Sequence, residues 1–193
     1  FGPGYGRNFA LNGNYSSSDS AADAAKFILV ADNDFNPSGM NNGIDFGNTN
    51  NSSLYAGPIR EIVIQGNAFR NIAGSAVYAS AYEMEFRNNV LYFEGAGGVT
   101  DSENPPSAGT HFSEASVYGN RFYKATTGGS WFIGMTSNDS GSNNRWEIFD
   151  NIMWLDGTSG GKFIVAMEGV QPASDGYIND NSYYNTGEQT LPF

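Results

Sequence analysis

The chain of 193 residues contains no cysteine, one histidine and only three lysines. Without cysteine it forms no disulfide, no thiolate zinc site and no thiol nucleophile. Its 9 basic residues against 20 acidic residues give a formal net charge of −11. This balance argues against a surface that coats nucleic acid or docks on an anionic membrane. No apolar run approaches the roughly 18 residues that a membrane-spanning helix needs, so we expect no membrane insertion.

Apolar residues make up 39% of the chain and aromatic residues 15%, which is enough for a packed core. The length fits one domain or two small ones. The sequence begins at Phe1 with neither an initiator methionine nor a signal peptide. We therefore expect a processed chain or a segment of a longer protein or assembly.

An eight-residue pattern recurs along the sequence, and we count its positions from a central asparagine. Positions −5, −3 and +2 are apolar or small, and position −1 is always Gly, Asn or Asp. The alternation predicts a strand on each side of a bend, with one face buried. Residues of the −1 types tolerate a left-handed backbone at low cost, so they place the bend. The six strong copies are centred on Asn33, Asn67, Asn89, Asn120, Asn151 and Asn181, and a weaker copy on Asn14.

The central asparagine is the same in every copy. A buried bend leaves backbone groups without partners, and stacked asparagine side chains would satisfy them and one another. The strong asparagines are spaced by 34, 22, 31, 31 and 30 residues, and each copy is followed by a second short apolar stretch. We therefore expect about three strands per repeat. Each strand should pair in parallel with its equivalent in the next repeat.

This pattern resembles the right-handed parallel β-helix repeats of the pectate-lyase-like superfamily, which carry an asparagine ladder. The resemblance covers residues 26–185 and implies an all-β right-handed parallel β-helix, a solenoid of six to seven rungs. Residues 1–25 would then be an N-terminal segment with a weak first rung and a short helix, and residues 186–193 a C-terminal tail. The fold hosts lyases, hydrolases, phage tailspikes and adhesins, so the resemblance alone selects no function. The catalytic residue sets of the family's lyases and polygalacturonases find no match.

Positions −6 and −4 predict an acidic stripe on one outer face, formed by Glu61, Glu83, Glu85 and Glu114. Carboxylates about 5 Å apart repel one another unless cations lie between them. Calcium is one explanation, because it prefers several oxygen ligands. Acid–base chemistry is a second, because crowding raises one pKa of a pair. The third is a solvated acidic face, relieved by Arg87 and Arg145.

Position +3 should point outward because position +2 points inward. It predicts an aromatic column of Tyr92, Tyr123, Trp154 and Tyr184 on consecutive rungs. Flat rings at a regular spacing suit stacking on sugar faces or anchoring a protein partner. The remaining interpretation is a self-stacked ladder covered by its own loops.

Long polar loops flank one short loop and predict a cleft beside Tyr78, which joins the ligand-binding candidates. Asp101 and His111 fall near this cleft, and His111 is either a base, a metal ligand or an exposed loop residue. Together with Glu83 and Glu85 they are the catalytic candidates.

Two functional interpretations remain open. The first is a β-helical module of a larger secreted, cell-surface or phage protein, which binds a carbohydrate polymer or assembles with copies of itself through its sides and ends. The alternative is a carbohydrate-active enzyme, a polysaccharide lyase or glycoside hydrolase, which uses the surface carboxylates with or without calcium. Both predict an extracellular, cell-surface or virion location.

Overall fold

The computed structural model describes residues 7–11, 26–36, 42–46, 59–70, 76–79, 81–93, 99–101, 114–124, 131–135, 145–156, 162–166 and 175–186. Every regular element in these ranges is a β-strand. Nor do these ranges contain a helix long and apolar enough to cross a membrane. The helix expected near residues 18–25 and the tail 187–193 lie outside them, while residues 7–11 form a strand.

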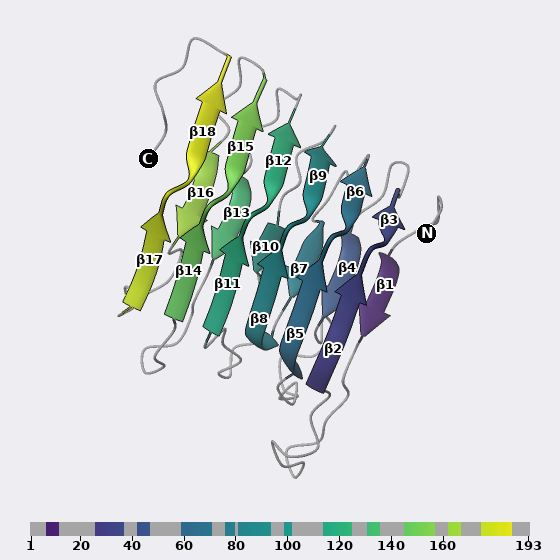
Figure 1. Ribbon diagram of the computed structural model, residues 1–193. Coiled ribbons are helices and arrows are strands. Elements are labelled where there is room, and N and C mark those ends of the chain that lie inside the picture. Colours follow the sequence, from purple (N-terminus) through teal and green to yellow (C-terminus); the bar gives the residue numbers. More distant parts are fainter. Residues whose placement is uncertain are drawn as a thin grey trace.

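The described strands form three six-stranded sheets (Figure 1). The first sheet contains β1 (Arg7–Leu11), β4 (Asn42–Phe46), β7 (Val77–Ala79), β10 (Val99–Asp101), β13 (Trp131–Met135) and β16 (Lys162–Ala166). The second sheet contains β2 (Lys26–Ala31), β5 (Ile59–Gln65), β8 (Ala81–Arg87), β11 (Glu114–Tyr118), β14 (Arg145–Phe149) and β17 (Asp175–Asn179). The third sheet contains β3 (Asp34–Phe35), β6 (Ala68–Arg70), β9 (Val90–Phe93), β12 (Arg121–Lys124), β15 (Ile152–Leu155) and β18 (Ser182–Asn185).

Each strand from β1 to β15 pairs with the strand three places further along the chain, and every pairing is parallel. Three consecutive strands, one from each sheet, therefore form one repeat. In Figure 1 the second and third sheets run together across the front, and the first sheet lies behind them. The expectations of an all-β chain and of parallel pairing between equivalent strands are confirmed.

The bend between the second and third sheets has a left-handed backbone in all six described repeats. The φ angles at position −1 lie between 53° and 65°. Four of these residues are Asp or Asn and two are glycines, which are the types that adopt this conformation most readily. The bend predicted from position −1 is therefore confirmed at Asp32, Gly66, Asn88, Gly119, Asp150 and Asp180.

The asparagine after the bend forms a continuous column of hydrogen bonds. Asn89 shows the pattern of the interior members. Its backbone N–H and its side-chain Nδ2 both donate to Oδ1 of Asn120, at 2.9 and 3.1 Å. Its Nδ2 also donates to the carbonyl of Ile64 in the preceding repeat, at 2.9 Å. Its own Oδ1 accepts from the backbone and side chain of Asn67. The same links join Asn33, Asn67, Asn89, Asn120, Asn151 and Asn181.

The apolar core lies between the three sheets. Positions −5 and −3 of the second sheet and position +2 of the third point into it, together with residues of the first sheet such as Ile44 and Val77. Phe35 and Phe69, at position +2 of adjacent repeats, stack with ring centroids 4.8 Å apart. Burial of such side chains stabilises the fold by about 1.5–3 kcal/mol each, so the core contributes far more than the surface pairs.

The two ends of the sheets differ in how well their core positions are covered. Position −3 is occupied by Val30 in the first repeat, which is 7% exposed, and by Ile148 in the fifth, which is fully buried. In the last repeat the same position is Ile178, which is 49% exposed. In the last described repeat a core-type side chain is therefore accessible to solvent.

Candidate functional site

The aromatic column lies on the outer surface of the third sheet. Its members Tyr92, Tyr123, Trp154 and Tyr184 are paired in register across β9, β12, β15 and β18. Tyr92, Trp154 and Tyr184 are between 38% and 49% exposed, and Tyr123 is half-buried. The side chains at position +3 of these four strands therefore point outward, as predicted.

The rings of the column contact one another. Tyr92 and Tyr123 stack at 4.9 Å and 7°, and Trp154 and Tyr184 stack at 5.5 Å and 24°. Tyr123 and Trp154 are tilted by 47° at 6.4 Å. The stacked faces point along the column, so solvent meets mostly ring edges. A flat ligand finds an open ring face only where a stack begins, ends or tilts.

A polar group fixes the middle of the column. The hydroxyl of Tyr123 lies 3.2 Å from Oδ2 of Asp156, and the hydroxyl of Thr186 donates to Oδ1 of the same residue at 2.5 Å. Desolvation, followed by the hydrogen bond to the Asp156 carboxylate, raises the pKa of Tyr123 above its ordinary value. Tyr123 therefore keeps its proton and donates to Asp156.

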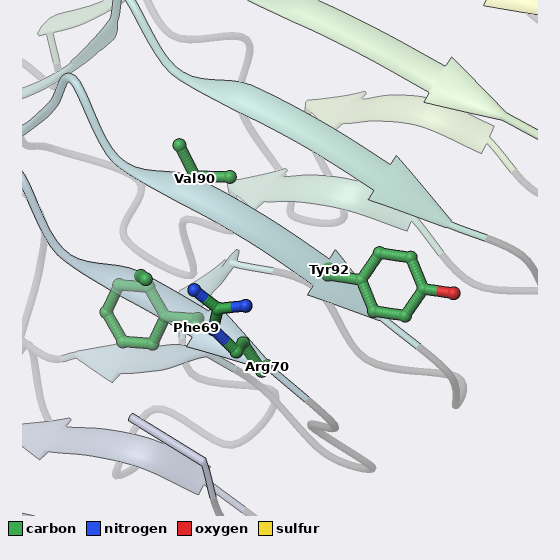
Figure 2. Close-up of a pocket in the computed structure, with 5 residues that line it drawn as sticks. Phe69, Arg70, Val90 and Tyr92 are labelled. Atoms are coloured by element: carbon green, nitrogen blue, oxygen red, sulfur yellow. The ribbon is translucent and has the colours of Figure 1, made fainter. Parts of the chain in front are cut away.

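A pocket of about 560 Å³ opens where the aromatic column begins (Figure 2). Its described lining comes from the third-sheet strands β6 and β9 and consists of Ala68, Phe69, Arg70, Val90 and Tyr92. Arg70 is the cation among the described lining residues, and its Nε lies 3.2 Å from Oδ1 of Asp34. We call this the Arg70 pocket.

The acidic stripe is interrupted in the structure. Glu61 has a left-handed backbone with φ of 56°, and the pairing of β5 with β8 passes from Arg60 directly to Ile62. Glu85 lies between Val63 and Ser116 in the register, so its neighbours across the sheet are not acidic. The described side chains contain no group of three metal-ligating residues. The side chains of Glu83 and Glu114 lie outside the described set.

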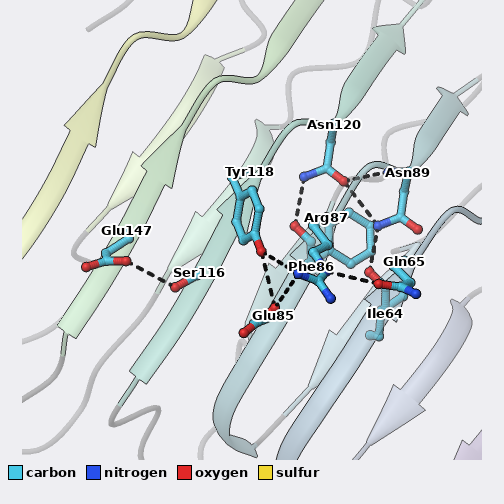
Figure 3. Close-up of polar contacts among 10 residues, drawn as sticks. All are labelled: Ile64, Gln65, Glu85, Phe86, Arg87, Asn89, Ser116, Tyr118, Asn120 and Glu147. Carbon is cyan, nitrogen blue, oxygen red and sulfur yellow. Dashed lines mark hydrogen bonds and ion pairs between the residues drawn. The ribbon is translucent and has the colours of Figure 1, made fainter. Parts of the chain in front are cut away.

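Glu85 belongs to a polar network on the outer face of the second sheet (Figure 3). Its Oε2 lies 3.2 Å from Nη1 of Arg87 and 3.2 Å from the hydroxyl of Tyr118. The same Nη1 donates to the Tyr118 hydroxyl at 2.9 Å, and Arg87 Nε donates to Gln65. The hydrogen bond to Tyr118 and the charge of Glu85 raise the pKa of Arg87, partly offset by desolvation. Arg87 therefore forms an ion pair with Glu85, while the three interpretations of the predicted stripe stay predictions, because most of its other charged side chains lie outside the described set.

The predicted cleft falls largely outside the described residues. His111 is not described, and the side chains of Tyr78 and Asp101 are not described although their backbones belong to β7 and β10. The register places Thr100 beside Tyr78 and Asp101 beside Ala79.

Three residues of these sites were not singled out by the sequence analysis, namely Arg70, Asp34 and Tyr118. Arg70 occupies position +3, one repeat before Tyr92. The residues at position +3 therefore already indicated that an arginine lies next to the first ring of the column. Tyr118 occupies position −2, the same position as Arg87 in the preceding repeat. Neither the pocket nor the network could be derived without the side-chain directions.

No protein-family model, no curated protein and no solved structure matches the chain.

Proposed function

We propose that the chain is a right-handed parallel β-helix module that binds carbohydrate along the aromatic column. The observation that supports this is the exposed series of rings in register on consecutive strands of the third sheet. Exposed aromatic side chains provide apolar contact area with little loss of conformational entropy, and their hydroxyl and indole groups add hydrogen bonds. The three parallel sheets with a pairing step of three strands support the β-helix assignment.

We also propose a location outside the cell, at a cell surface or in a virion, as part of a larger protein. The support is compositional: the chain is acidic, poor in lysine and rich in polar residues. A stiff module with a solvent-facing column would present its ligand surface along its side.

The test is binding to a panel of neutral and acidic polysaccharides by affinity electrophoresis and calorimetry. Trp154→Ala should weaken retention by about tenfold, the effect of losing one well-placed contact. The matched control is Tyr177→Ala, because Tyr177 is 48% exposed but lies on the second sheet. Equal losses in the two variants, or no binding by the original chain, would contradict the proposal.

Assembly through the C-terminal end is a second candidate. It is favoured by Ile178, whose 49% exposure contrasts with the buried residues at the same position in the preceding repeats. Light scattering and electron microscopy would reveal oligomers or fibres. Ile178→Lys should abolish them, whereas Ile152→Lys, a change at a laterally exposed residue, should not. A monomer at every concentration would exclude this candidate.

The enzyme alternative rests on the contact between the Tyr118 hydroxyl and Glu85 beside Arg87, which could pass a proton to or from a bound sugar. Polysaccharide turnover would be followed through unsaturated products and reducing ends, with and without calcium. Activity that disappears in Glu85→Gln and persists in Glu147→Gln would favour a lyase or hydrolase over a binding module.

A further inference from the structure

The Arg70 pocket differs from the rest of the aromatic column because one of its rings has an open face. Tyr92 stacks on Tyr123 with the planes 7° apart, so one face of its ring is covered. The opposite face looks toward the preceding repeat, where Arg70 is its register partner. Among the described residues no ring or cation contacts that face. The exposed fraction of Tyr92 is 38%.

Arg70 offers hydrogen-bond donors in the same pocket as Tyr92. Its Nε is engaged by Oδ1 of Asp34, while its two terminal nitrogens have no hydrogen-bond or ion-pair partner in the described part of the chain. The side chains of Arg70 and Asp34 are 58% and 61% exposed, so a ligand reaches them from solvent. A guanidinium is planar and presents parallel donors, which suits two neighbouring oxygen atoms.

The charge of the pocket favours neutral hydroxyl oxygens over anionic oxygens in a ligand. Asp34 already balances Arg70, so the pair is neutral, and the chain as a whole carries −11. An anionic ligand would therefore approach a negative molecule and compete with Asp34 for the same cation. Hydroxyl groups need no charge compensation and accept hydrogen bonds from an arginine that keeps its carboxylate partner.

We infer that the Arg70 pocket binds one ring of a neutral sugar, and this inference rests on the proposed carbohydrate binding. The C–H face of the ring lies on the open face of Tyr92. Two adjacent hydroxyl oxygens accept hydrogen bonds from the terminal nitrogens of Arg70. Val90, which is 51% exposed, and Ala68 contact the ring edge, and the volume of about 560 Å³ is large enough for a sugar ring.

The test uses neutral oligosaccharides of glucose, xylose, mannose or galactose units, with oligogalacturonate as the anionic match. Binding is measured by calorimetry and by saturation-transfer NMR at two salt concentrations. Arg70→Gln and Tyr92→Leu should each weaken binding of the neutral ligand by about tenfold or more. Arg121→Gln is the control, since Arg121 is exposed on the same sheet but does not line the pocket. The affinity of the original chain should change little with salt.

Three outcomes overturn the inference, and they separate it from the proposed function. If binding falls in Trp154→Ala but not in Tyr92→Leu or Arg70→Gln, the column binds carbohydrate and the pocket does not. If oligogalacturonate binds more tightly than the neutral sugars, and salt weakens it, the ligand class is wrong. If the original chain binds none of the saccharides, both the inference and the proposed function are wrong. Circular dichroism of each variant excludes loss of folding as the cause.

Discussion

Truncating one interior asparagine of the ladder should destabilise the protein more than any surface substitution. Asn120→Ala removes four side-chain hydrogen bonds, two donated by Nδ2 to Phe86 O and Asn151 Oδ1 and two accepted by Oδ1 from Asn89. The backbone N–H of Asn89 and the carbonyl of Phe86 then lose partners in a buried site. At about 1–3 kcal/mol for each of the two stranded groups, the free energy of unfolding should fall by roughly 2–6 kcal/mol.

The matched variant is Asn33→Ala at the first position of the ladder. Asn33 is only partly buried, and its side chain donates to Ala31 O and Asn67 Oδ1. The backbone N–H of Asn33 still bonds Asn67 Oδ1 after truncation, so no buried donor is stranded there. We expect a loss of about 1 kcal/mol. Urea unfolding monitored by circular dichroism and tryptophan fluorescence measures both changes. Equal losses in the two variants, or a loss below about 1 kcal/mol for Asn120→Ala, would refute the reasoning.

Asn120→Asp removes the Nδ2 donor of Asn120 but keeps the shape of the side chain, so it tests the donor alone. The variant keeps an acceptor at Oδ1 but places an oxygen opposite Phe86 O and Asn151 Oδ1, which both accept from the original amide. The buried acid then prefers its protonated form, so its pKa rises on folding. The variant should consequently become more stable, relative to the original chain, as the pH falls. No pH dependence of this difference would mean that the donor is dispensable.

Three further predictions concern the bend, the aromatic column and the open end. Gly119→Ala should cost about 1–2 kcal/mol of unfolding free energy by urea titration, because its φ is +65° and a Cβ would lie 2.6 Å from a neighbouring side-chain oxygen. Tyr123 should titrate above the ordinary tyrosine pKa when its absorbance is followed at 295 nm, and Asp156→Asn should lower its pKa. Because the pKa of Tyr123 is raised on folding, its contribution to stability is present below about pH 10 and is lost as the pH rises through the pKa of the folded state. Ile178→Ala should cost much less than Ile148→Ala, for which about 2–5 kcal/mol is expected, and amide exchange should be fastest in the last repeat; equal costs would show that the last repeat is covered.

The parts of the fold that follow from short-range chemistry could be predicted from the sequence. The residue types at Asp32, Gly66 and Asn88 mark a left-handed bend because few other side chains tolerate one. Equal spacing of the apolar positions then requires parallel pairing between equivalent strands, which the register contains. The bend depends on one residue and its immediate neighbours, and the pairing depends on a pattern that each repeat carries.

Features that depend on local irregularity could not be predicted. Phe27 and Glu61 have positive φ although neither residue type favours it, and the pairing of β2 with β5 skips them. This removes Glu61 from the regular series on which the acidic stripe was based. The direction of a long side chain is equally inaccessible from sequence, so the approach of Arg87 to Glu85 and Tyr118 appears only in the structure.

The hydrogen bonds of the ladder all point the same way, with each asparagine donating to the one that follows. Every interior unit thus presents the same amide geometry to both neighbours, whatever the number of residues that separates them, which varies from 22 to 34. Whole units could therefore be duplicated or deleted without disturbing the junctions, while the intervening segments change length independently. A gene encoding this chain can lengthen or shorten its product by integral steps.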